Sequence, residues 1–454
     1  MLRPLVGEEV SLDQDCRHSQ VGATFATGLE GLLMQPTERV GHMRSRHDRI
    51  LDLAERRLSL GVDRGLIQRR IEDESLDGAI ITLDGAKLVN FSSCAYLGLN
   101  RDPRLKSGAI DAVRRFGTSY SSSPTYTALG MYDQLEAQLR QMTDAAVAIP
   151  QTTTLAHLAS LPILVGPEDL ALIDAQSHDS VQLAATTLKG NGVAVEVVPH
   201  NDVAVLATIL ADRAGSYHRV WYLADGIYSM YGDTAPVREI VELLDSYPNL
   251  HLYFDDAHGF GWQGLHGRGF VLNEVPIHPR MVVAAGLSKS FGTLGAVLAF
   301  GDPGFARRVR LTGGPLTFSG PVPPPALGAA VASAAIHLSG EHAERRAQLV
   351  SDIEWCRAEI AARQLPVLSV ATTPIWYVRV GGPESVAEMV VRLMKDGYYL
   401  NAAAYPAVPI GYGGIRFTQT LHNTRDQTLG LIESINRHLP GVIEEVSETI
   451  DLRE

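Results

Sequence analysis

The stretch "HLYFDDAHGFGWQGLHGRG", residues 251–269, ends an apolar run with two adjacent carboxylates, Asp255 and Asp256. His258 comes three positions after Asp255, and five glycines come close behind. An ionised carboxylate at the end of a buried strand is costly unless a cation meets it. The stretch therefore predicts a site at the end of this strand, with a cationic partner for the acid.

Short β-branched runs alternate with helical patterns from about residue 145 onward, in the manner of an α/β fold. The strand-like runs are "AVAIP", "DLALID", "VAVEVVPH", "RVWYLAD", "LHLYFDD", "MVVAAG" and "GAVLAFG". This alternation predicts a mainly parallel sheet with helices on both faces. Ligands bind beyond the carboxyl ends of such strands. Asp225, Asp255 and Lys289 each follow a strand-like run, so we expect them to face one crevice.

The pattern changes near the Pro-rich stretch "GPVPPPALG", residues 320–328. A long amphipathic segment follows it, and then two strand-like runs and two further helical patterns, which is typical of a smaller α+β domain. We therefore expect three parts: an N-terminal extension and arm over 1–95, a large domain over 96–328 and a small C-terminal domain over 329–454.

Composition and charge favour small molecules as the partners of this chain. The chain has 454 residues, 45% hydrophobic and 20% charged, and a net charge of -12, which argues against a nucleic-acid partner. The three cysteines, Cys16, Cys94 and Cys356, are too few for a disulfide framework, so we expect a reducing cytoplasm. No segment offers about 18 uncharged apolar residues, and we expect neither a membrane span nor an export signal.

Lys289 is the strongest chemical candidate. It is one of only five lysines, beside 34 arginines, and it lies in "MVVAAGLSKSFGTLGAV" among apolar and small residues. Such a lysine can extend its charged end to solvent. It can also serve as a desolvated amine that forms a Schiff base. Pyridoxal phosphate (PLP) would explain both Lys289 and the opening stretch, because a buried carboxylate such as Asp255 keeps its pyridine nitrogen protonated.

Seven motifs occur in the order and approximate spacing of one enzyme family. They are "NFSSCAYLGL" (90–99), "SHDS" (177–180), "DGIYSMYGD" (225–233), "DDAHGFGWQGLHGRG" (255–269), "LSKSFG" (287–292), "FSGPVPPP" (318–325) and "IRFTQT" (415–420). Together they resemble the α-oxoamine synthases, PLP-dependent enzymes of the aspartate-aminotransferase fold (fold type I). The resemblance covers roughly residues 65 to 440, and it implies a mainly parallel seven-stranded sheet in the large domain.

The resemblance implies a role for each matching residue. Lys289 matches the lysine that binds PLP and later moves the Cα proton of the substrate. Asp255 matches the partner of the pyridine nitrogen. His258 and Ser229 match residues that contact the phenolic oxygen of the cofactor, and His178 matches the histidine that stacks on its ring. Without the other motifs, His178 would be read as a residue at a helix start, and Ser229 as a turn residue.

The expected phosphate site departs from the family pattern. Gln151, Thr152 and Thr153 occupy the turn where relatives usually have Ser, Gly and an aromatic residue. Hydroxyl groups can supplement backbone donors at a helix start, although this segment can also be an ordinary N-terminal cap. Gly286 stands where a threonine is common, and Ser288 can compensate.

Two residues are expected to meet the substrate carboxylate. Arg416 matches the C-terminal-domain arginine that binds it, because a guanidinium suits two-point contact with a carboxylate. Cys94 stands where the family often has asparagine. Cysteine is a poor hydrogen-bond donor, so this change bears on the amino-acid substrate more than on the cofactor.

The resemblance implies a decarboxylative condensation of an amino acid with an acyl thioester, either acyl-CoA or acyl-carrier protein, to give an α-aminoketone. It also implies a homodimer with a shared active site. Another PLP reaction, such as transamination, retro-aldol cleavage or carbon–carbon bond formation without a thioester, stays open. A non-catalytic partner subunit is the third alternative, but such subunits typically lose the lysine that Lys289 provides.

Overall fold

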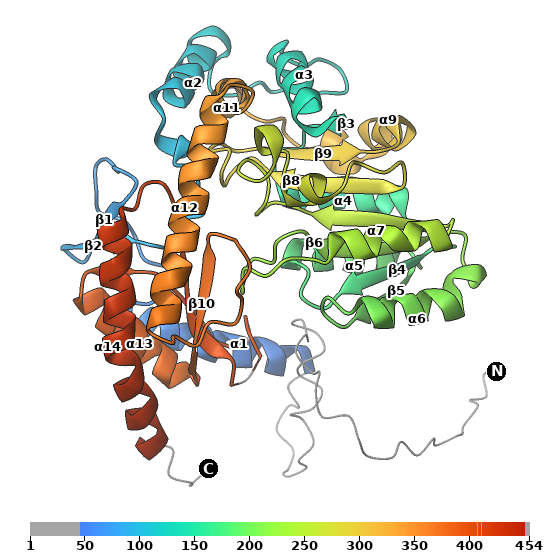
Figure 1. Ribbon diagram of the computed structural model, residues 1–454. Coiled ribbons are helices and arrows are strands. Elements are labelled where there is room, and N and C mark those ends of the chain that lie inside the picture. Colours follow the sequence, from blue (N-terminus) through green and yellow to red (C-terminus); the bar gives the residue numbers. More distant parts are fainter. Residues whose placement is uncertain (1–45, 406, 410, 450–454) are drawn as a thin grey trace, which may run out of the picture.

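The computed structural model describes residues 46–405, 407–409 and 411–449 (Figure 1). Residues 1–45 of the expected N-terminal extension, including Cys16, lie outside the described residues. Figure 1 shows the central sheet on one side of the molecule and the C-terminal strands and helices, including the long helix α12 (Glu341–Ala362), on the other. Within the described ranges, no helix is both long and apolar enough to span a membrane.

A seven-stranded sheet forms the centre of the larger part, in the order β3-β9-β8-β7-β6-β4-β5. Its strands are β3 (Ala146–Ala148), β9 (Ala296–Phe300), β8 (Met281–Gly286), β7 (Leu250–Asp255), β6 (Val220–Asp225), β4 (Leu170–Asp174) and β5 (Ala194–Val198). The strands from β8 to β5 are parallel, and β9 runs antiparallel to both of its neighbours. The predicted mainly parallel α/β fold is confirmed.

Helices cover both faces of this sheet because side chains alternate along each strand. Tyr253 packs with one face, where the helices are α4 (Thr153–Leu164), α5 (Asp179–Gly190) and α9 (Pro303–Thr312). Leu252 and Phe254 pack with the other face. There the helices are α3 (Met131–Thr143), α6 (Val203–Arg213), α7 (Val237–Ser246), α8 (Phe270–Glu274) and α11 (Pro324–His337).

The C-terminal part has its own hydrophobic cluster and a small antiparallel sheet in the order β10-β13-β12. The strands are β10 (Ile375–Gly381), β13 (Gly413–Thr418) and β12 (Asn401–Ala403), and the helices are α12, α13 (Pro383–Lys395) and α14 (Arg425–Thr449). The N-terminal hairpin of β1 (Ile80–Leu83) and β2 (Ala86–Asn90) joins this part, because β2 pairs in parallel with β11 (Tyr398–Tyr399).

The Pro-rich stretch hides a helix that the sequence analysis did not identify. α11 begins at Pro324, where a proline costs no helical hydrogen bond, and it packs against α2 (Pro103–Phe116). The two helices approach closely, since a Cβ added to Gly108 would lie 2.6 Å from the carbonyl oxygen of Gly328. The remaining helical segments are α1 (Arg46–Asp63), α10 (Gly314–Thr317) and the 3-10 turns Leu99–Arg101, Ala214–Ser216 and Leu265–Gly267.

Candidate active site

A cavity of about 190 Å³ opens at the carboxyl ends of the central parallel strands, where α/β sheets bind ligands. Its lining residues are Thr152, Thr153, Thr154, His178, Ser180, Asp225, Ile227, Asp255, Ala257, His258, Ser288 and Lys289. Lys289 thus faces the same space as Asp225 and Asp255, as predicted from the strand pattern.

Asp255 and Asp256 serve different purposes although they are adjacent. Asp255 ends β7 and lines the cavity, and its Oδ1 accepts a hydrogen bond from the Ala257 amide at 3.0 Å. Asp256 is fully buried, and its Oδ2 accepts from the Val271 amide at 3.0 Å. A Cβ at Gly259 or at Gly269 would collide with the Asp256 carboxyl group, which explains two of the glycines that follow. Asp256 therefore holds the glycine-rich loop in place.

The environments of these acids separate their pKa values. Burial raises the pKa of Asp255, but the charge of His157 and its hydrogen bond outweigh burial, and the pKa falls to about 2. Burial raises the pKa of Asp256 well above its usual range. The pKa of Asp225 is also raised, because the side chain is buried and lies near the negative charge of Asp255. Asp255 is thus the ionised carboxylate of the cavity.

His157 is a site residue that the sequence analysis missed. It is fully buried on α4, and its Nε2 lies 2.9 Å from Oδ2 of Asp255. The other ring nitrogen, Nδ1, lies 2.8 Å from the hydroxyl of Tyr253. Tyr253 and Asp255 are two residues apart and share a face of β7, and His157 lies one helical turn beyond Thr153, but the sequence does not show that α4 packs on this face.

His258 is buried, lines the cavity and is held by a hydrogen bond to Tyr96. Its Nδ1 lies 2.7 Å from the hydroxyl of Tyr96, which comes from the "NFSSCAYLGL" motif. Burial lowers the pKa of His258 well below its usual value, and the charges of Lys289 and Arg416 lower it further. His258 is therefore neutral near pH 7, with one ring nitrogen as donor and the other as acceptor.

His178 is the N-cap of α5 and also lines the cavity, while its stacking on the cofactor ring stays a prediction. Its Nδ1 accepts from the Ser180 amide at 3.2 Å, which makes His178 the N-cap of the helix. Its own backbone amide donates to Oδ1 of Asp225 at 3.1 Å. Burial lowers the pKa of the imidazole, and the charge of Asp255 opposes that shift. These contacts fix the histidine at the cavity mouth.

The threonines at the start of α4 lie at the helix N-terminus and also line the cavity, while their binding of a phosphate stays a prediction. Thr152 is the N-cap, since its Oγ1 accepts from the Leu155 amide at 3.2 Å, and Thr152 and Thr153 line the cavity. A Cβ added to Gly286 would lie 2.9 Å from Oγ1 of Thr153 and 3.8 Å from Oγ of Ser288. Thr153 therefore uses the space that a side chain at position 286 would need.

Three predicted site residues form a group beside the cavity without lining it. Arg416 is buried on β13, its Nε donates to the carbonyl oxygen of Ser229 at 2.7 Å, and its Nη2 lies 3.8 Å from Sγ of Cys94. The predicted contact of Ser229 through its side chain stays a prediction. Gln151 precedes the N-cap of α4 and does not line the cavity either.

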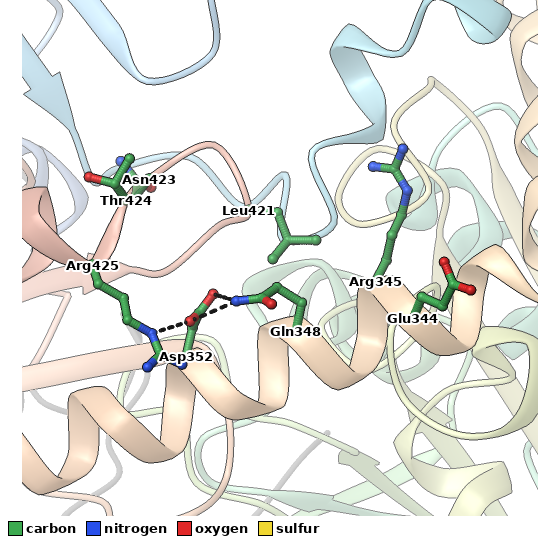
Figure 2. Close-up of a pocket in the computed structure, with 8 residues that line it drawn as sticks. All are labelled: Glu344, Arg345, Gln348, Asp352, Leu421, Asn423, Thr424 and Arg425. Carbon is green, nitrogen blue, oxygen red and sulfur yellow. Dashed lines mark hydrogen bonds and ion pairs between the residues drawn. The ribbon is translucent and has the colours of Figure 1, made fainter.

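A larger hollow of about 430 Å³ lies elsewhere, between α12 and the loop after β13 (Figure 2). Figure 2 shows Arg425 and Gln348 both turned toward Asp352. Arg425 contacts Asp352 at 2.7 Å, and Arg345 pairs with Glu341 and Asp102. Both arginines of this hollow are thus already paired with carboxylates, so we place the chemistry at the cavity of Lys289.

Comparison with known proteins agrees with this geometry. The family described as "Aminotransferase class I and II" matches residues 86–433. An 8-amino-7-oxononanoate synthase of Treponema denticola is 31% identical over 372 residues, which cover 80% of this chain and 91% of that protein. The chain belongs to the α-oxoamine synthase family. A serine palmitoyltransferase of Bacteriovorax stolpii is another relative of this α-oxoamine synthase, 29% identical over 79% of this chain and 84% of that protein.

Solved structures share the fold of this α-oxoamine synthase. Serine palmitoyltransferase of Sphingomonas wittichii superposes with a TM-score of 0.79 at 23% identity, and it covers 88% of this chain and 100% of that one. A serine palmitoyltransferase described with PLP as an internal aldimine gives a TM-score of 0.78 at 23% identity over 88% and 99% of the two chains.

The cavity of this α-oxoamine synthase fits PLP, the cofactor of its family. Lys289 provides an amine, Asp255 provides a buried ionised carboxylate for a protonated ring nitrogen, and the threonines at the start of α4 provide hydroxyl groups beside a helix N-terminus. These groups have the charge and the donors that the aldehyde, pyridine and phosphate parts of the cofactor require.

Proposed function

We propose that this enzyme condenses an amino acid with an acyl thioester, with loss of CO₂, to give an α-aminoketone. The single observation that carries the proposal is the meeting of Lys289 and the ionised Asp255 at one cavity. Membership of the α-oxoamine synthases supports the reaction type, as do relatives named 8-amino-7-oxononanoate synthase and serine palmitoyltransferase.

PLP, when bound, supplies the electron sink that makes the bonds at the Cα atom of an amino acid breakable. Nζ of Lys289 holds the cofactor and moves the Cα proton. Asp255 keeps a proton on the ring nitrogen, and neutral His258 presents a ring nitrogen to the phenolic oxygen. His178 covers the ring, and Thr152, Thr153 and Ser288 bind the phosphate.

The substrate carboxylate binds to Arg416 in this proposal. Arg416 is oriented by the Ser229 carbonyl and lies beside Cys94, at the edge of the cavity. A buried guanidinium that keeps part of its donor fork available suits a carboxylate in two-point contact. Cys94 leaves this carboxylate with one strong donor residue, and it shapes the choice of amino acid.

The bonds of the reaction balance as follows. The Cα proton leaves to Lys289, a carbon–carbon bond forms between Cα and the acyl carbon, and the carbon–sulfur bond of the thioester breaks to release the thiol. The carboxylate then leaves as CO₂, and one proton returns to Cα. His178, at the mouth, is placed to stabilise charge on the acyl oxygen.

A panel of amino acids and acyl thioesters tests this function. The holoenzyme is incubated with each pair, and free thiol, CO₂ and the product mass are measured. We expect thiol and CO₂ in equal amounts, together with an aminoketone. Turnover of an amino acid without any need for thioester would instead support transamination or retro-aldol cleavage, which the change at Cys94 leaves open.

We also propose a cytoplasmic homodimer whose two subunits complete each site. Phe318 is 92% exposed and Tyr126 is 83% exposed, and Ser123 joins their two segments by donating to the Thr317 carbonyl at 2.6 Å. Exposed aromatic side chains of this size favour coverage by a partner. The free thiols of Cys94 and Cys356 support a reducing compartment.

A further inference from the structure

His157 uses both ring nitrogens in the interior of the protein. The side chain is fully buried between α4 and β7, with Nε2 at 2.9 Å from Oδ2 of Asp255 and Nδ1 at 2.8 Å from the Tyr253 hydroxyl. Tyr253 is itself fully buried, and its hydroxyl also lies 3.0 Å from Oγ of Ser160. Tyr253, His157 and Asp255 thus form a hydrogen-bonded chain that ends at the cavity.

The proton positions in this chain follow from its far end. Oγ of Ser160 donates to the Ala156 carbonyl at 2.7 Å, so toward Tyr253 it can only accept. If His157 is neutral, the Nε2 proton points at the ionised Asp255, which can only accept, and Tyr253 donates to Nδ1, which leaves the contact of Tyr253 with Ser160 without a proton. If His157 is charged, Nδ1 donates to Tyr253, Tyr253 donates to Ser160, and Nε2 still donates to Asp255. Both charge states therefore place a donor on the carboxylate.

Asp225 shows what happens to a neighbouring acid that lacks such a histidine. Asp225 and Asp255 are directly opposite each other at the ends of β6 and β7, and both are buried. Within the described part of the chain, the Asp225 side chain accepts a hydrogen bond from the His178 amide alone, and burial raises its pKa. The charge and the hydrogen bond of His157 instead lower the pKa of Asp255 against its burial. Among the described residues, Asp255 has an imidazole partner and Asp225 does not, and this partner favours the ionised form of Asp255.

We infer that His157 is a positioning residue for the cofactor: through Asp255 it fixes and charges the carboxylate that pairs with the ring nitrogen, and Tyr253 fixes His157. Oδ1 of Asp255 is held by the Ala257 amide, so the histidine on Oδ2 completes the orientation of the carboxylate. A group that orients the partner of a reacting group acts through its hydrogen bond. This inference rests on the role of Asp255 in the proposed function.

A comparison of two ligands isolates the effect on the ring nitrogen. The apoprotein is titrated with PLP and with the carbocyclic analogue in which carbon replaces the ring nitrogen, and both dissociation constants are measured. His157→Leu removes the donor, and we expect it to weaken PLP about tenfold, the equivalent of one unit in the pKa of Asp255. The dissociation constant of the analogue should change less than about twofold, since the analogue has no ring nitrogen whose protonation Asp255 could stabilise.

Two more variants keep the test decisive. His157→Gln retains a neutral donor toward Asp255 and should recover part of the loss. Tyr253→Phe keeps the ring and removes only the hydroxyl, so it should lower the preference for PLP even if the leucine variant fails to fold. His251→Gln is the matched control, because His251 is a buried histidine on the same strand whose Nδ1 bonds to the Asn249 carbonyl.

Equal weakening of both ligands in the His157 and Tyr253 variants would overturn the inference, because it would indicate a purely structural role. Unchanged binding of both ligands would overturn it as well. Asp255→Asn separates this outcome from failure of the proposed function. If Asp255→Asn keeps the preference for PLP, the proposed role of Asp255 is wrong. If it loses the preference while the His157 variants keep it, only the inference about His157 is wrong.

Discussion

Single residues at this site owe their chemistry to the face on which they lie. Asp255 faces α4 and receives an imidazole, whereas Asp256 faces the glycine-rich loop and receives a backbone amide. The sequence predicted Lys289 and Asp255 at one crevice, because each ends a strand-like run. It did not reveal His157, since a lone histidine in an apolar helix has no distinctive pattern, and its partner becomes visible only when α4 packs on β7.

The two adjacent acids give a matched pair of substitutions. Burial raises the pKa of Asp256, so Asp256→Asn should change the free energy of unfolding by less than about 1 kcal/mol at low pH, where the carboxyl group is protonated. A raised carboxyl pKa makes the stability of the wild type fall as pH rises above the ordinary value of 3.8. The asparagine variant lacks this carboxyl group, so its stability should not show this fall. Near pH 7 its free energy of unfolding should equal or exceed that of the wild type. Thermal unfolding across pH measures this.

Asp255→Asn should behave in the opposite way. It removes the one ionised carboxylate of the cavity, so kcat should fall by at least about 100-fold while the fold is retained. Steady-state kinetics and circular dichroism check the two halves of this statement. Comparable activity in both asparagine variants would contradict the division of roles between Asp255 and Asp256.

At the scale of elements, the site depends on contacts between strand ends and helix starts. All seven strands of the central sheet were predicted from alternation of the sequence pattern, whereas α8, between β7 and β8, was not. The α11 helix was missed because its prolines suggested a break. The pairing of β2 with β11 could not be predicted either, since it joins segments about 300 residues apart. The boundaries near 95 and 328 stay predictions.

The contact of Gly286 with Thr153 predicts a reciprocal exchange between β8 and α4. Gly286→Ser alone should weaken PLP about tenfold, because its Cβ would press on Oγ1 of Thr153, and one displaced donor costs about this much. Thr153→Ala alone should weaken PLP through loss of the hydroxyl. The double variant should recover most of the affinity, as measured by titration of the apoprotein. Additive losses in the double variant would show that the two positions are independent.

His200 links the end of β4 to the loop that carries Ser229. Its Nδ1 lies 2.9 Å from Asp174 and its Nε2 lies 2.7 Å from Asp233. Burial lowers the pKa of His200, but the hydrogen bonds and charges of both acids raise it to about 9. This stabilisation is complete below the ordinary value of 6.5 and is lost as pH rises through about 9.

His200→Gln should therefore lower the free energy of unfolding by on the order of 3 kcal/mol near pH 6, and by much less near pH 10. Denaturant unfolding of the wild type and the variant at both pH values measures the difference. A loss that is independent of pH would contradict the charged state of His200 between the two acids.

At the scale of the whole molecule, the described surface retains large exposed aromatic side chains, among them Phe318, the first residue of the motif "FSGPVPPP". Phe318→Glu should turn the proposed dimer into a monomer, since a charge at that position disfavours burial against a partner. Light scattering would report the mass, and activity should fall with it. Phe318→Tyr is the control, because it keeps an aromatic ring at the same place. A dimer that survives the glutamate would contradict this interface.

The proposed chemistry depends most on the amine of Lys289. The holoenzyme is reduced with borohydride and digested, and the reduced cofactor is located by peptide mass. We predict the added mass on the peptide that contains Lys289, and on none that contains Lys87, Lys106, Lys189 or Lys395. Label on one of those four lysines, or a coloured holoenzyme that yields no labelled lysine, would contradict it.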